Sequence, residues 1–341
     1  MRTSFVIVTY NSEQALRGAL PALAEQLRDG DELIVVDNAS ADGSADVAAE
    51  LVPSALIVRN GANTGFAAGC NAGAAAAGGA LLVFLNPDAR PAPGFRDAIE
   101  RPVRDDLGWG AWMGLVTMDG GKLVNTSGGV LHFTGIGWAG EAGVPLGAAQ
   151  GTHEVGFVSG ACFAIPRESY LSTGGFPEHF FMYCEDVDLS LRVRLRGGSL
   201  GVVPGARVDH DYEFAKGSLK WRRLERNRLA TVVRTYPALL LALVAPALVV
   251  TEVAILAAAI SGGWARQKLL AWADLAAAAP LLRRERKEVQ RSRTITAAEF
   301  ARTLTAELSS PYLGAVARSA PVLLGLRAYW ALVRAVLRLG G

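Results

Sequence analysis

Cysteine is scarce in this 341-residue sequence, which contains only Cys70, Cys162 and Cys184. None of the three belongs to a C-x-x-C pair, the spacing on which cysteine-based zinc sites are usually built. An odd number of widely spaced cysteines also argues against a disulfide framework. We therefore expect reduced thiols in the core of a protein from a reducing compartment.

A Walker P-loop is absent as well, because G-x-x-x-x-G-K-[ST] occurs nowhere in the chain. The glycine- and asparagine-rich residues 63–71 (NTGFAAGCN) do not follow the G-x-G-x-x-G pattern of dinucleotide-binding loops. They can be a glycine-rich helix start, or they can offer backbone N–H groups and Asn side chains to a ligand.

Strong net charge is lacking, since 34 Lys and Arg against 32 Asp and Glu leave +2, and this argues against a nucleic-acid-binding protein. Two segments are nevertheless basic, residues 220–234 and 283–293. Between them, residues 236–265 contain Glu252 as their only charge, a run long enough to span a bilayer. Two prolines interrupt the run and both flanks are basic, which favours an interfacial or re-entrant membrane helix. A buried helix of a C-terminal domain is the alternative.

Apolar, β-branched runs alternate with helical patterns over the first hundred residues. Strands are predicted at residues 4–10, 32–38, 55–60 and 80–85, with helices at 12–27, 44–52 and 67–79. Buried strands separated by helices indicate an α/β fold, a Rossmann-like and mostly parallel sheet sandwiched by helices. Residues 109–152 look less regular, and the chain becomes all-helical after about residue 213. We expect an α/β domain at residues 1–212 and a helical, membrane-associated extension at 213–341.

The N-terminus shows a short apolar run that leads directly into a strand-and-turn pattern. Secretory signals need a longer apolar region before a cleavage site. We therefore expect a cytoplasmic protein.

Polar residues follow each of the four predicted strands. Ligands of such sheets bind beyond the carboxyl ends of the strands, where these side chains would converge. The candidates are Thr9, Tyr10 and Asn11; Asp37 and Asn38; Arg59, Asn60, Asn63 and Gly65; and Asn86 and Asp88.

Asp88 stands in an Asn-Pro-Asp turn directly after the strand ending at Leu85. Its carboxylate can simply bond nearby amides. It can also hold Mg²⁺ or Mn²⁺, because such cations use one or two carboxylates together with phosphate oxygens and water. Asp37 has a similar pair of interpretations, an Asx turn or helix cap on one side and a hydrogen bond to a nucleobase or ribose on the other.

Three acids, Glu185, Asp186 and Asp188, gather at a predicted helix start. Acidic residues favour helix N-termini for electrostatic reasons alone. The preceding aromatic residues 179–183 (HFFMY) instead suggest the wall of a pocket, in which a carboxylate accepts a proton from an attacking hydroxyl. His210, between Asp209 and Asp211, is a surface histidine or a metal ligand near Asp88 that one of those acids orients.

Five segments in this order resemble family 2 glycosyltransferases of the GT-A fold, especially bacterial rhamnosyltransferase-like members. They are residues 5–11 (FVIVTYN), 35–44 (VVDNASADGS), 59–73 (RNGANTGFAAGCNAG), 81–89 (LLVFLNPDA) and 174–192 (GGFPEHFFMYCEDVDLSLR). The resemblance covers residues 3–212, with a weaker echo at 222–229 (RRLERNRL).

The resemblance implies an inverting transfer of a sugar from a nucleotide-diphosphate donor to an acceptor hydroxyl. Asp186 matches the catalytic base. Asn86-Pro87-Asp88 stands where the family commonly has Asp-x-Asp, so that Asp88 and His210 would hold a divalent cation, Mg²⁺ or Mn²⁺. The nucleotide sugar would contact Thr9, Tyr10, Asn11, Asp37, Asn38, Arg59, Asn63, Gly65, Asn86 and Asp88. An acceptor or sugar pocket would be formed by Ser159, Gly160, Tyr183 and Glu185.

The implied partners are a dTDP- or UDP-sugar, with rhamnose as the sugar suggested by family likeness, and a lipid-linked or cell-envelope glycan. The implied setting is polysaccharide biosynthesis at the inner face of the cell membrane, without nucleic acid. Two alternatives stay open. A nucleotidyltransferase would show a glycine-rich basic loop after the first strand, which residues 8–17 (VTYNSEQALR) do not. An inactive sugar-nucleotide-binding protein would have lost Asp88 or Asp186, and both are present.

Overall fold

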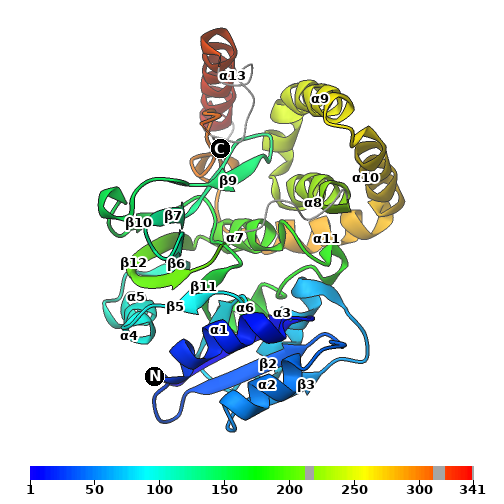
Figure 1. Cartoon of the computed structure of the whole chain (residues 1–341). Helices are drawn as coiled ribbons and strands as arrows, with labels where there is room; N and C mark the ends of the chain where they lie inside the picture. Colours follow the sequence, from blue (N-terminus) through cyan, green and yellow to red (C-terminus); the bar gives the residue numbers. More distant parts are fainter. Residues whose placement is uncertain (212–218, 310–318, 340–341) are drawn as a thin grey trace. The chain divides into compact units, whose positions relative to one another are not determined.

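The computed structural model describes residues 1–211, 219–309 and 319–339 (Figure 1). The chain divides into two compact units. The first comprises Met1–Gly129, Ala139–Val193 and Gly198–Tyr212, and the second comprises Val130–Trp138, Arg194–Gly197 and Glu213–Gly341. The domain boundary predicted at residues 212 and 213 lies outside the described residues.

The described residues of the first unit form a ten-stranded sheet, as expected for an α/β fold (Figure 1). Its main path runs through β10 (His153–Glu154), β12 (Ser199–Asp209), β6 (Trp109–Met118), β11 (Cys162–Pro166), β4 (Leu81–Leu85), β1 (Thr3–Thr9), β2 (Glu32–Asp37) and β3 (Leu56–Arg59). Two short strands pair beside this path, β5 (Arg90–Pro91) with β12 and β7 (Leu123–Thr126) with β6.

Parallel pairing is confined to two parts of the sheet. The neighbours β4, β1, β2 and β3 are parallel, and so are β6 and β12. Strand β11 is antiparallel to both β4 and β6 and joins the two parts. All residues of β1 and β4 are buried, which explains why both strands read as continuous apolar runs.

The strand β6 corrects the expectation of an irregular segment beyond residue 109. Gly110 and Gly114 weaken its strand pattern, but both are needed for close packing. A Cβ at Gly110 would lie 2.6 Å from Val193 Cγ1, and one at Gly114 would lie 2.2 Å from the carbonyl oxygen of Ala206. A segment that looks interrupted in sequence is therefore a ten-residue strand in the interior of the sheet.

Helices connect the strands of the first unit. They are α1 (Glu13–Ala24), α2 (Ser44–Leu51), α3 (Gly65–Ala76), α4 (Phe95–Ile99), α5 (Arg101–Arg104), α6 (Arg167–Ser172) and α7 (Glu185–Leu195), with 3₁₀ turns at Leu146–Ala148 and Glu178–Phe180. Helix α3 approaches β1 closely, because a Cβ at Gly73 would lie 2.3 Å from Val6 Cγ1. Nearer the helix N-terminus, a Cβ at Gly69 would lie 2.6 Å from Val8 Cγ1, so this part of α3 lies close to the carboxyl-terminal part of β1.

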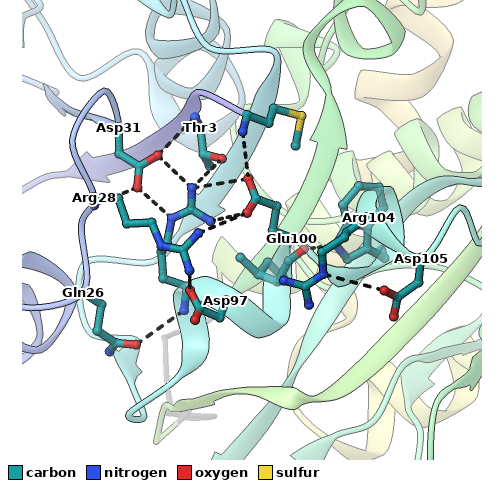
Figure 2. Close-up of polar contacts among 12 residues, drawn as sticks. Thr3, Gln26, Arg28, Asp31, Asp97, Glu100, Arg104 and Asp105 are labelled. Carbon is teal, nitrogen blue, oxygen red and sulfur yellow. Dashed lines mark hydrogen bonds and ion pairs between the residues drawn. The ribbon is translucent and has the colours of Figure 1, made fainter.

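A buried arginine secures the opposite, amino end of the sheet. Arg96 of α4 is 2% exposed and lies 2.7 Å from Asp31, just before β2, and 2.8 Å from Glu100. Figure 2 shows the surrounding network, in which Arg28 pairs with Asp97. The terminal amine of Met1 also lies 3.9 Å from Glu100. The cluster joins α4 to the start of β2 and was not predicted from the sequence.

A G-x-G-x-x-G string does occur at residues 135–140. It lies in and around the hairpin between β8 (Gly129–Leu131) and β9 (Gly137–Ala139). A dinucleotide-binding loop instead links a strand to the start of a helix, so this string is not such a fingerprint.

The second unit is helical in its described C-terminal part. It contains α8 (Leu219–Thr235), α9 (Ala238–Ser261), α10 (Ala265–Ala277), α11 (Ala279–Arg291), α12 (Ala297–Ala301) and α13 (Ala320–Leu339). Helix α8 packs against α10 and α11, and α9 packs against α10, α12 and α13. Among the described helices, α9 and α13 are long and apolar enough to cross a membrane.

Candidate active site

Thr9, Asp37 and Arg59 stand in one row across the carboxyl ends of three neighbouring strands. The register pairs Thr9 of β1 with Asp37 of β2, and Asp37 with Arg59 of β3. The ladder continues one residue further, since Asn38 N–H donates to the Thr9 carbonyl and Asn60 N–H to that of Asp37. The ends of β1, β2 and β3 therefore place these residues side by side, as expected from the sequence.

The side chains at these strand ends differ in their exposure to solvent. Thr9 is completely buried, and its hydroxyl has no hydrogen-bond partner among the residues the structure describes. Asp37 is 4% exposed and accepts a hydrogen bond from the Ser40 N–H at 3.2 Å. Tyr10 and Asn11 are exposed, and Asn11 Oδ1 accepts from the Ala41 N–H at 2.7 Å. Tyr10 and Asn11 are therefore the accessible part of the first strand end.

Asn38 acts inside the protein. It is 2% exposed, its amide donates to the Gly65 carbonyl at 3.0 Å, and its Oδ1 accepts from Asn60 and from Thr64. Asn63 Oδ1 accepts from the Gly65 N–H at 3.0 Å. This amide network holds the N-terminus of α3 at the sheet edge, and Thr64 is a member that the sequence did not reveal.

Arg59 lies at the rim of the site. Its guanidinium is 2.8 Å from the Asp46 carboxylate, and both side chains are exposed. An exposed pair of this kind contributes little to stability, so Arg59 can exchange Asp46 for a ligand anion at small cost.

Asp88 and His210 meet although they are far apart in the sequence. His210 Nε2 lies 3.1 Å from Asp88 Oδ1 and 3.2 Å from Asn86 Nδ2. The histidine side chain is 6% exposed and that of Asp88 is 47% exposed. Strand β12 brings them together, because Asp209 pairs with Arg90 of β5 just after the Asn-Pro-Asp turn.

The two acids beside His210 hold the turn after β6. Asp209 Oδ1 accepts from the Gly121 N–H at 2.9 Å, and Asp211 Oδ1 accepts from the Asp119 N–H at 3.0 Å. The sequence suggested that one of them orients the imidazole. In the structure the ring nitrogen Nε2 lies against Asn86 and Asp88.

Asp186 lies in the first turn of α7 and is partly exposed. Its Oδ2 accepts from the Gly160 N–H at 2.9 Å and its Oδ1 from the Val187 N–H at 2.8 Å. Burial raises the pKa of this carboxyl above its usual range, against the effect of the two N–H donors.

One short turn connects Asp186 to the end of β4. The Asn86 N–H donates to the Ala161 carbonyl at 3.0 Å, and the preceding residue of that turn, Gly160, donates to Asp186. The Ser159 hydroxyl closes the turn by accepting from the Ala161 N–H at 3.3 Å. Asp88, two residues after Asn86, and Asp186 are therefore tied to the two sides of the turn at residues 159–161.

The three acids of α7 have different environments. Glu185 is 6% exposed, and its Oε2 has no hydrogen-bond partner among the described residues. Burial and the neighbouring Asp186 raise the pKa of Glu185. Asp188 is completely buried and lies 2.6 Å from Arg192, whose guanidinium also donates to the carbonyls of Thr173 and Gly175. Of the three, Asp186 is the most accessible.

The loop before α7 is strained. Phe181, Tyr183 and Cys184 all have positive φ angles, of 64°, 74° and 64°, a backbone region that costs about 1–3 kcal/mol per non-glycine residue. The Phe181 carbonyl accepts from the Ala67 N–H of α3 at 3.1 Å, and a Cβ at Gly65 would lie 2.5 Å from that same oxygen. The loop thus couples the start of α3 to the start of α7, where Asp186 lies.

The possible metal donors in the described residues are few. No group of three or more His, Cys, Asp or Glu side chains gathers there as a ready ligand set. Asp88 and His210 are two donors at one place, which leaves room for water and for ligand oxygens around a cation.

Comparison with protein families identifies the first unit. The model of glycosyl transferase family 2 matches residues 4–113. The chain carries a family 2 glycosyltransferase domain. The match includes the strand ends of β1 to β4 and the Asn-Pro-Asp turn.

Curated relatives of this glycosyltransferase are bacterial. The chain is 26% identical over 235 residues to an N-acetylglucosaminyl-diphospho-decaprenol L-rhamnosyltransferase of Mycobacterium tuberculosis, covering 62% of this chain and 76% of that protein. It is 36% identical over 86 residues to the rhamnosyltransferase WbbL of Escherichia coli (strain K12), covering 22% and 33%.

Solved structures agree on the fold of the glycosyltransferase domain. The chain superposes on S. aureus TarS 1-349 in complex with UDP-GlcNAc with a TM-score of 0.58 at 15% identity, covering 100% of this chain and 92% of that one. It superposes on GalNAc-T7 with UDP, GalNAc and Mn²⁺ with a TM-score of 0.57 at 17% identity, covering 70% of this chain and about half, 48%, of that one. These likenesses confirm the predicted GT-A architecture.

Proposed function

We propose that this glycosyltransferase moves a sugar, with inversion, from a nucleotide-diphosphate donor to an acceptor hydroxyl, with Asp186 as the base. The observation that carries the proposal is the turn at residues 159–161. It bonds to Asn86 on one side and to Asp186 on the other, so the strand end that carries Asp88 adjoins the start of α7.

The chemistry assigned to Asp186 balances in a single displacement. The acceptor oxygen forms a bond to the anomeric carbon while its proton moves to the Asp186 carboxylate. The bond from that carbon to the donor diphosphate breaks, and the diphosphate leaves with the electron pair. A carboxyl whose pKa is raised by burial is a stronger base than an ordinary aspartate, which suits a proton acceptor working near neutral pH.

The donor nucleotide is assigned to the edge formed by β1, β2 and β3. Tyr10, Asn11 and Arg59 are accessible there, and Asp37 can turn its second oxygen toward a ribose or base. Thr9, Asn38 and Gly65 are buried and act on this binding site through the backbone and the amide network, whereas Asn63 is exposed and uses its Oδ1 to accept from the Gly65 N–H.

A divalent cation fits the residues at the end of β4. A carboxylate and an imidazole nitrogen 3.1 Å apart, one of them half exposed, form a donor set that suits Mn²⁺ or Mg²⁺. Such an ion would offset the negative charge that develops on the leaving diphosphate. Asn86, within hydrogen-bond distance of the same imidazole, would help to position His210.

The sugar and acceptor are assigned to the side of Asp186. Gly160 donates to its carboxylate and shares a turn with Ser159, the loop with Tyr183 directly precedes α7, and the adjacent Glu185 is buried. The M. tuberculosis relative is named for a decaprenol-linked acceptor and for rhamnose. By likeness we infer a lipid-linked or cell-envelope glycan as acceptor, dTDP-rhamnose as donor, and a place at the cytoplasmic face of the membrane in polysaccharide biosynthesis.

A donor panel tests the reaction class. Purified protein is incubated with dTDP-rhamnose, UDP-N-acetylglucosamine or GDP-mannose, with MnCl₂ or EDTA, and the release of nucleoside diphosphate is measured. We expect release from one donor class that depends on the metal and on Asp186. Release of pyrophosphate from a nucleoside triphosphate and a sugar phosphate would instead identify a nucleotidyltransferase. Tight donor binding without turnover, even with a lipid-linked acceptor present, would identify a binding protein.

A further inference from the structure

Helix α9 of the second unit has one strongly apolar face that nothing in the described chain covers. Five large aliphatic side chains on it are between 41% and 68% exposed: Leu239, Val249, Val250, Val253 and Ile260. Exposed apolar residues scattered singly are common, but every exposed position of α9 from Leu239 to Ile260 is apolar, which indicates a surface that binds something apolar.

The opposite face of α9 is directed into the protein. Leu240, Val244 and Ala259 are its completely buried residues. At about 100° per residue, the centre of this buried set lies about 180° from the centre of the exposed set. Tyr329 of α13 also donates a hydrogen bond to the Leu243 carbonyl, which ties α9 to its neighbour. The helix is therefore one-sided over its whole length.

Glu252, between the two faces, joins a buried ionic cluster. Its carboxylate pairs with Arg228 of α8 and lies 2.7 Å from Lys268 and 2.6 Å from Trp272 of α10. Lys268 is completely buried and also bonds Glu225 of α8 at 2.5 Å. Two cations and two anions thus neutralise one another, and they fasten α9 to two polar helices.

The position of this cluster along α9 bears on whether the helix crosses a bilayer or lies along its surface. Glu252 is the fifteenth of the 24 residues of α9, so in a helix crossing the membrane it would lie within about 5 Å of the midplane. Its partners on α8 and α10 would have to reach the same depth. Those helices also carry the Arg222–Asp274 pair and the exposed Arg266, which would then face hydrocarbon at a cost of several kcal/mol. Crossing is therefore disfavoured, whereas lying along the surface leaves the cluster intact.

Two further features fit a membrane surface. Trp264, just after α9, stacks on the exposed Trp221 with ring centroids 4.8 Å apart, and tryptophans favour the boundary between lipid and water. The two parts of the chain also carry net charges of opposite sign. Residues 213–341 contain 20 Lys and Arg against 8 Asp and Glu, whereas residues 1–212 contain 14 against 24. The helical region is thus at +12, which is complementary to anionic lipid headgroups.

We propose that α9 is an in-plane membrane anchor. Its Leu239–Ile260 face inserts among the acyl chains of an anionic leaflet, and the ionic cluster around Glu252 holds α8 and α10 on the cytoplasmic side. The proposal rests on the membrane location given under the proposed function, and it adds that the helix does not cross.

Labelling of both helix ends tests this arrangement. Ala238→Cys and Ser261→Cys variants of the full chain are expressed, and inside-out cytoplasmic-membrane vesicles are treated with a membrane-impermeant maleimide. The unsubstituted chain supplies the background, because Cys70 and Cys162 are buried and Cys184 is partly buried. Both variants should label from the outside to the extent seen in detergent, whereas Val250→Cys should be protected. Labelling of only one end before detergent would show a crossing helix and overturn the proposal.

Vesicle flotation tests the surface itself. Combined Val249→Ser, Val250→Ser and Val253→Ser changes should lower binding to phosphatidylglycerol-containing vesicles by about tenfold or more. Leu171→Ser, at a residue of α6 that is 45% exposed, is the matched control and should bind like the unsubstituted protein. Equal flotation of all three proteins would overturn the proposal. Donor hydrolysis in detergent is measured separately, so a failure of the proposed glycosyl transfer would not alter either result.

Discussion

His210 Nε2 lies 3.1 Å from Asp88 Oδ1, and this contact brings the last strand of the sheet to the turn after β4. If the pair holds a divalent cation, Asp88→Ala and His210→Ala should each weaken Mn²⁺-dependent binding of the nucleotide sugar by more than about tenfold. Calorimetric titration with and without Mn²⁺ measures this. His153→Ala, in β10, is the matched control. Donor affinity that is the same with and without metal would show that the site does not use one.

Glu185 predicts a specific dependence of stability on pH. Its folded-state pKa is raised by burial and by Asp186, so the folded protein keeps a proton that the unfolded chain releases. The stability of the native protein relative to Glu185→Gln should therefore fall as pH rises from about 5 to about 8, and the two should differ little below the ordinary glutamate range. Urea unfolding at several pH values measures the difference. A difference that does not change with pH would indicate that Glu185 is ionised in the fold.

Arg96 predicts a large effect on stability that leaves the chemistry alone. Arg96→Met would leave the buried Asp31 carboxylate without its cation and Glu100 with only the longer pairs to Met1 and Arg28, and should cost about 3–5 kcal/mol of unfolding free energy. Arg101→Met removes only an exposed pair with Asp105 and should change stability by about 0.5 kcal/mol or less. Donor affinity should persist in folded Arg96→Met, since the cluster lies at the amino ends of the strands. Equal destabilisation by both changes would refute this account of the cluster.

The sequence predicted the fold well where the evidence is local. Strands β1, β2 and β4 are apolar runs because neighbours bury both of their faces, and their order with α1, α2 and α3 follows from alternation along the chain. The interior position of β6 and the length of β12 were missed, because both depend on pairing between distant segments and on glycines that are read locally as breaks.

The sequence indicated which residues lie at the site, but not which of them face solvent and which bond within the protein. Asp186 and Asp188 stand in one helical turn, yet Asp186 is partly exposed whereas Asp188 is buried and paired with Arg192. The sequence does not show this difference in burial. Asn38 looks like a ligand contact in sequence, yet its amide is used within the protein. The Arg96 cluster gave no signal, because its partners come from separate parts of the sequence.

The most direct test of the catalytic account is Asp186→Asn. The amide can still accept from Gly160 or Val187, so the fold should persist, but it cannot take the acceptor proton. Turnover of the preferred donor and acceptor should fall by about 10²–10⁴-fold while the affinity for the donor, measured by titration, stays within about twofold. Glu185→Gln, one residue away and buried, should retain most of the activity. Undiminished turnover by Asp186→Asn would contradict the central claim that this carboxylate is the base.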